Sequence, residues 1–101
     1  MSEETATTVG VVHIAIAVPA ETLKEKRAVV KSVVERLRNR FNASVAEVAH
    51  LDTPSRATIA AACVSNSSAH AQSQLQAIAD TVEAWRLDVE ILDIQTELIQ
   101  L

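Results

Sequence analysis

Basic side chains are concentrated in one short segment of this sequence. Seven of the nine lysine and arginine residues lie there: Lys24, Lys26, Arg27, Lys31, Arg36, Arg38 and Arg40. Only Glu25 and Glu35 oppose them, so the segment carries 7 − 2 = +5 and the rest of the chain 2 − 11 = −9. Lysine and arginine side chains bind phosphate groups. The seven residues are therefore candidate contacts for RNA.

The basic segment is predicted to form one amphipathic helix over residues 23–40. Thr22 offers an N-cap, and Glu25 completes a capping box three residues later. On a helical wheel, one flank of the apolar stripe carries Lys24, Arg27, Lys31 and Arg38, and the other carries Lys26, Arg36 and Arg40. Glu35 interrupts the first row. Such a row suits phosphate contact, and the alternative interpretation is a solvated helix face whose long stems cover the core edge.

The remaining patterns predict the elements that position this helix. Strands are expected over 9–18, 43–50, 56–65 and 89–97, and a second helix over 69–86 with Trp85 on its buried stripe. The alternation of the last strand shifts, which indicates a bulge or a late start of the strand. The order β-α-β-β-α-β predicts an α+β, ferredoxin-like split βαβ sandwich, with two helices on one face of a four-stranded antiparallel sheet. We expect one domain over 9–101 and a disordered tail over 1–8.

The other face of this sheet has no layer to cover it. Strand 56–64 is rich in alanine in either alternation, so the sequence leaves open which set faces the helices. An uncovered apolar sheet favours an interface. The alternative function is therefore a protein-interaction module or homodimer without a nucleic-acid role. The strands contain no aromatic residue, so base stacking on the sheet is excluded and a helix contact would read backbone or shape.

The residues that could support catalysis or metal binding are sparse. His13, Glu47 and His50 could meet across the open face, the one metal-like arrangement worth testing. Cys63 is alone and reads as a small core residue, and the single glycine, Gly10, excludes a glycine-rich phosphate loop. We predict no enzymatic activity, no cofactor and no metal. With no apolar run of membrane-spanning length and no signal peptide, a cytoplasmic protein is expected.

Several segments together resemble the YlxP-like family of small bacterial proteins of unknown function. They are residues 22–27, 36–42, 44–48, 56–57 and 64–66, and the resemblance covers nearly all of 9–98. It implies a ferredoxin-like fold and no established activity or cofactor. Genes of this family often lie beside those for translation initiation and ribosome maturation factors, which implies a role near the small ribosomal subunit. Thr22 stands where the family usually has serine, a change that keeps the cap. We therefore expect an RNA- or ribosome-associated accessory factor that docks through its basic helix.

Overall fold

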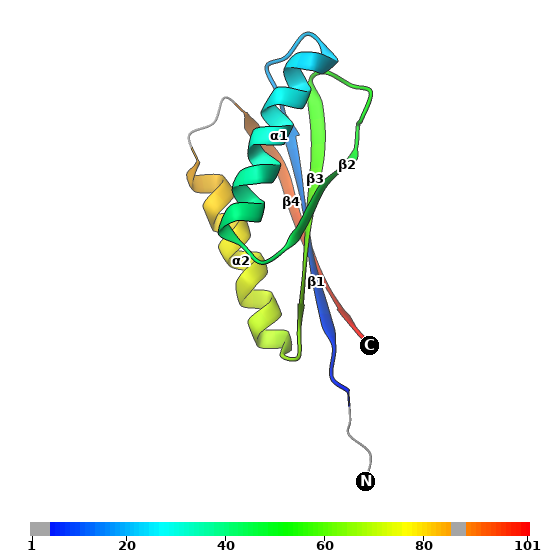
Figure 1. Cartoon of the computed structure of the whole chain (residues 1–101), viewed down its shortest axis with the longest axis vertical. Helices are drawn as coiled ribbons and strands as arrows, with labels where there is room; N and C mark the ends of the chain where they lie inside the picture. Colours follow the sequence, from blue (N-terminus) through cyan, green and yellow to red (C-terminus); the bar gives the residue numbers. More distant parts are fainter. Residues whose placement is uncertain (1–4, 86–88) are drawn as a thin grey trace.

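The computed structural model describes residues 5–85 and 89–101. Its elements follow the predicted order: β1 (Thr8–Ala17), α1 (Leu23–Arg40), β2 (Ser44–Ala49), β3 (Arg56–Ser65), α2 (Ser68–Ala84) and β4 (Glu90–Gln100). The four strands form one antiparallel sheet in the order β2-β3-β1-β4. Both helices lie on the same face of it (Figure 1). The predicted ferredoxin-like α+β arrangement is confirmed.

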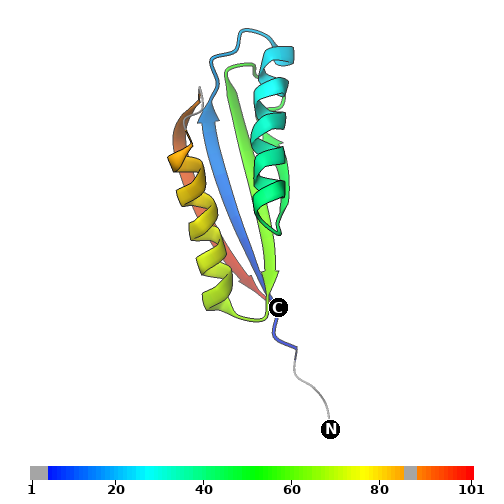
Figure 2. The same cartoon turned by 60° about the vertical axis from the view of Figure 1, so that its left-hand side comes forward.

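The two helices divide the covered face of the sheet between them. α1 packs on β2 and β3, whereas α2 packs on β1, β3 and β4. Figure 2 shows the helices side by side above the sheet, running in opposite directions. The far face of the sheet therefore lacks a covering layer within the described residues, which makes α1 and the open face the two large surfaces that could meet a partner.

The register identifies which side chains of the alanine-rich strand face the helices. Ile14 of β1 pairs with Ile59 of β3, and both are almost fully buried. Because strand side chains alternate, Ala57, Ala61 and Cys63 share the helix-covered face with Ile59, and all three are buried. Ala60 and Ala62 are consequently on the open face. The choice that the sequence left open is set by the large side chain of Ile59.

Side-chain caps account for the N-terminal ends of both helices. The Thr22 hydroxyl accepts a hydrogen bond from the Glu25 backbone N–H at 3.1 Å and donates one to the Glu25 carboxylate at 3.0 Å. The predicted N-cap of α1 is thus confirmed. The Ser67 hydroxyl caps α2 in the same way, accepting from the His70 N–H at 3.2 Å. The β1–β4 register shifts between Ala15 and Ile16, which confirms the predicted bulge in the last strand.

Several predicted boundaries were wrong by a few residues. Thr8, placed in the tail, begins β1 and is buried, with its hydroxyl 3.3 Å from that of Ser68. The predicted disorder over residues 1–4 lies outside the described residues. α2 ends at Ala84, and Trp85 is its C-cap residue instead of a member of the buried stripe. The extended backbone of Trp85 (ψ 131°) ends the helix there and leaves the indole only partly buried.

Candidate nucleic-acid interface

Six of the seven predicted RNA contacts are exposed on α1. They are Lys24, Arg27, Lys31, Arg36, Arg38 and Arg40. Glu25 and Glu35 are the exposed carboxylates of the helix, so its solvent-facing surface carries 6 − 2 = +4. A rigid helix holds these charges at fixed spacing. The surface is therefore electrostatically suited to a phosphate backbone.

Lys26, the seventh predicted contact, is buried with no exposed surface. The prediction that it lies with Arg36 and Arg40 on a flank of the apolar stripe was wrong, because its side chain is within the buried row. Lys26 begins the buried row that Val30, Val33 and Leu37 continue, because steps of four, three and four residues return to one helix face. A fully buried ammonium cannot reach a phosphate, so Lys26 is removed from the candidate interface.

The Lys26 ammonium joins α1 to the turn between β2 and β3. Its Nζ donates hydrogen bonds to three backbone carbonyls: those of His50 at 2.7 Å, Leu51 at 3.2 Å and Arg56 at 3.2 Å. These use the three N–H donors that an ammonium has. Glu47 Oε2 lies 2.9 Å from Nζ, so its negative charge balances the charge of the ammonium. No hydrogen bond from a described residue to this oxygen meets the geometric criteria, so the contact is an ion pair. The group is thus satisfied in the way a buried charge requires.

The turn that Lys26 holds has an unusual backbone at His50. This residue has φ 60°, in the left-handed region that non-glycine residues seldom adopt. The His50 carbonyl accepts from the Thr53 N–H at 3.1 Å as well as from Lys26. The bonds from Lys26 therefore offset the local backbone strain and fix the turn against the N-terminal part of α1.

The row on the β2 side of α1 is the better-formed part of the surface. The Arg38 guanidinium donates to the Val45 carbonyl at 2.6 Å, which anchors the row to β2. One bond uses one of the five N–H donors of arginine and leaves others for a ligand. Glu35 Oε1 lies 4.0 Å from Lys31 Nζ, as expected for a residue that interrupts the row. Among the described residues, no ion pair is recorded for Lys24 or Arg27.

The opposite flank is already engaged with α2. The Arg36 guanidinium carbon lies 5.6 Å from the centre of the Trp85 ring, within range of a cation–π contact. Arg40 lines a hollow of about 280 Å³ together with Asp80, Thr81 and Trp85. The contact with Trp85 directs Arg36 toward the second helix, and Arg40 lies at the hollow beside it. We therefore take Lys24, Arg27, Lys31 and Arg38, hereafter the basic row, as the interface and the other two arginines as secondary.

The chain matches a known protein family over most of its length. A family model described as "Protein of unknown function (DUF503)" matches residues 9–96. The chain belongs to the DUF503 family. The Bacillus subtilis (strain 168) relative "Uncharacterized protein YlxP" is 36% identical to it over 66 residues, which cover 65% of this chain and 72% of the relative. The resemblance found in the sequence is confirmed, and it comes without an established function.

A solved structure with the same fold as this DUF503 protein is the "De novo designed protein Foldit4". It superposes with a TM-score of 0.51 at 16% sequence identity, covering 88% of this chain and 96% of the designed one. An identity this low supports the fold alone. Neither α1 nor α2 of the DUF503 chain combines the length and apolar character needed to span a membrane.

The metal-like arrangement suggested for this DUF503 chain does not form. His13 projects from the open face, whereas Glu47 pairs with Ile59 on the helix-covered face and contacts Lys26. The two faces of the sheet separate His13 from Glu47, so the arrangement of His13, Glu47 and His50 that the sequence allowed is not present. In the part of the chain that the structure describes, no three His, Cys, Asp or Glu side chains are grouped to hold a metal.

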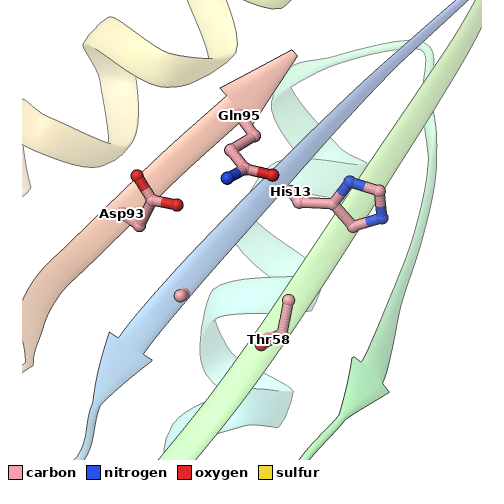
Figure 3. Close-up of a pocket in the computed structure, with 5 residues that line it drawn as sticks. His13, Thr58, Asp93 and Gln95 are labelled. Atoms are coloured by element: carbon pink, nitrogen blue, oxygen red, sulfur yellow. The ribbon is translucent and has the colours of Figure 1, made fainter. Parts of the chain in front are cut away.

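His13 instead lies in a shallow hollow of about 350 Å³ on the open face of the DUF503 sheet. Ala15, Thr58, Asp93 and Gln95 also line it. Figure 3 shows the labelled side chains projecting from β1, β3 and β4. Sequence reasoning had not brought β4 next to His13; the register His13–Gln95 does so.

Proposed function

We propose that this protein is a non-enzymatic, cytoplasmic accessory factor that docks on ribosomal RNA of the small subunit through the basic row of α1. The observation that carries the proposal is a net charge of +4 on the exposed surface of one helix in a chain of net charge −4. A surface of this kind binds phosphates with release of counterions. The small subunit is favoured by the gene neighbourhood that the YlxP-like resemblance implies.

The form of the contact follows from the side chains on the row. Lysine and arginine on a helix neutralise backbone phosphates, and these contacts position a protein without reading sequence. Successive cations of the row, Lys24, Arg27 and Lys31, lie three and four residues apart, about 4.5 and 6 Å along a helix axis at 1.5 Å per residue. These steps are comparable to the separation of neighbouring phosphates, so a single RNA strand can follow the row.

The acidic remainder of the chain sets the strength of this contact. Outside residues 24–40 the sequence carries −9, which repels free RNA at long range. We therefore expect weak binding to isolated RNA and stronger binding to an assembled particle that presents RNA to α1 alone.

The proposal is tested by sedimentation with purified small ribosomal subunits. The wild-type protein is expected to co-sediment, and charge reversal at Lys24, Arg27 and Lys31 is expected to leave it in the supernatant. Unchanged co-sedimentation of the reversed variant would remove α1 as the contact. Affinity purification from native cells, assayed for both RNA and protein, identifies the partner in the same material.

A further inference from the structure

The open face of the sheet is a second large surface, chemically unlike α1. The strand register places five rows of side chains on it. From one end to the other they are Val64–Val9–Ile99, Ser44–Ala62–Val11–Glu97, Ala46–Ala60–His13–Gln95 and Ala49–Thr58–Ala15–Asp93, with Arg56–Ala17–Glu90 at the last edge. This surface therefore has a centre of mostly small side chains, an apolar end and one acidic side.

The centre is recessed because its side chains are short. Ala15, Ala60 and Ala62 form the floor, and the longer side chains of β4 rise beside them. The hollow of about 350 Å³ at His13 and Asp93 lies in this floor (Figure 3). A recessed alanine floor has room for the side chains of a segment laid along the sheet.

One end of the face carries large apolar side chains that are exposed. Val64 is 70% exposed and Ile99 is 41% exposed, and both pair with Val9 in one register row. Leu101, 81% exposed, follows directly after them and bonds to Thr7. Grouped large apolar side chains of this kind mark an interaction surface.

One side of the face is acidic. β4 contributes Glu90, Asp93 and Glu97, all exposed. The β2 side offers uncharged residues, which are Ser44, Ala46 and Ala49 in the register and Val48, 47% exposed, at the bulge before Ala49. Among the residues that the structure describes, Arg56 at the corner is the one lysine or arginine that the register places on this face. An occupant must therefore combine apolar side chains for the floor with cations along β4.

We propose that the open face binds a basic amphipathic segment of a partner protein. Its apolar side would cover Val9, Val64 and the alanine floor, and its lysines or arginines would face Glu90, Asp93 and Glu97. Charge complementarity excludes RNA, which the β4 carboxylates repel. This inference does not depend on the RNA proposal, because it uses the opposite face of the molecule.

A second copy of the chain fits the open face less well. Two open faces packed together bring six carboxylates from β4 against two Arg56 side chains. The basic α1 of another copy has the right charge, but its exposed residues include no large apolar side chain to cover Val64 and Ile99. A separate partner with both properties is the better match.

The test uses the whole isotope-labelled protein and a short amphipathic peptide of leucine and lysine, with a leucine–glutamate peptide as its matched control. Backbone amide shifts are expected to move at Val11, Ala15, Ala60 and Ala62. The double variant Asp93→Lys, Glu97→Lys should lower the affinity for the basic peptide by about tenfold or more. The double variant Asp80→Lys, Glu83→Lys, which changes two exposed carboxylates of α2, should leave its affinity unchanged.

Three results would overturn the proposal. One is shifts confined to the helices, which would place the peptide elsewhere. Another is that the acidic peptide binds as tightly as the basic one, or that the α2 variant loses as much affinity for the basic peptide as the β4 variant does. Either result would show that the β4 carboxylates do not select the partner. The last is a doubled mass in light scattering with the open-face amides shifted in the absence of peptide, which would make a second copy the occupant.

Discussion

The Nζ of Lys26 on α1 lies 2.9 Å from Oε2 of Glu47 on β2, and the lysine side chain has no exposed surface. This contact, with the three carbonyls around the same ammonium, ties the basic helix to the β2–β3 hairpin. Lys26, which the charge pattern grouped with the RNA contacts, thus fixes the position of the helix that carries the other six basic residues.

The first prediction concerns this buried charge. Lys26→Met should lower the free energy of unfolding by about 3–5 kcal/mol, because it leaves the Glu47 carboxylate and three carbonyls without their partner. Lys24→Met, on the exposed part of the same helix, should leave the value near wild type. Urea unfolding followed by circular dichroism measures both. Equal stabilities would show that water replaces the lysine without cost.

The burial of Lys26 has a signal in the sequence that charge counting obscures. Lys26, Val30, Val33 and Leu37 fall on one helix face by spacing alone, so the sequence already placed a lysine at the start of the buried row. Its partners were not visible in this way. Glu47 and the carbonyls of the β2–β3 turn meet it only because α1 packs on β2 in the folded chain.

The order of helices and strands could be predicted from local patterns. Which side chains of β3 face the helices could not. Period-two alternation marked β1, and the cap signal at Thr22 marked the start of α1. β3 has alanine on both faces, so its orientation depends on Ile59 packing beneath the helices opposite Ile14. The hollow at His13 likewise depends on β4 pairing with β1, which no spacing in the sequence encodes.

A second prediction tests the N-cap of α1. Thr22→Ala should cost about 1 kcal/mol of stability, because the Glu25 N–H loses the hydroxyl that accepts its hydrogen bond at 3.1 Å. Thr22→Ser keeps that oxygen and should match wild type within experimental error. Thermal unfolding of the three proteins under one set of conditions makes the comparison. Equal losses for alanine and serine would assign the effect to the lost methyl group.

A third prediction concerns Gly10, where β1 passes closely under α2. A Cβ at this position would lie 3.1 Å from Leu75 Cδ1 and 3.2 Å from Cys63 Sγ. Gly10→Ala should therefore destabilise the protein by about 1–3 kcal/mol through overpacking. Shortening the neighbour with Leu75→Val should reduce that penalty. A double-mutant cycle measures the coupling between the two sites, and strictly additive effects would contradict the contact.

A fourth prediction uses the carboxylate that interrupts the basic row. Glu35→Gln removes a negative charge 4.0 Å from Lys31 and should strengthen binding to a ribosomal RNA fragment by roughly fivefold at low salt. Stability should barely change, since exposed ion pairs contribute little. Glu83→Gln on α2 removes the same charge away from the row and serves as the control. Binding that responds equally to both variants would indicate a net-charge effect without a defined interface.

The measurement that tests the central claim most directly is the salt dependence of binding to small-subunit RNA, for two variants of equal net charge. One is Lys24→Gln, Arg27→Gln, Lys31→Gln on α1; the other is Ala69→Glu, Gln72→Glu, Ser73→Glu on the exposed side of α2. Each lowers the net charge by three. We predict that the α1 variant loses affinity and that its slope of log K against log salt falls by about 2–3, whereas the α2 variant keeps the wild-type slope. Equal slopes for all three proteins would contradict the assignment of α1 as the RNA-binding surface.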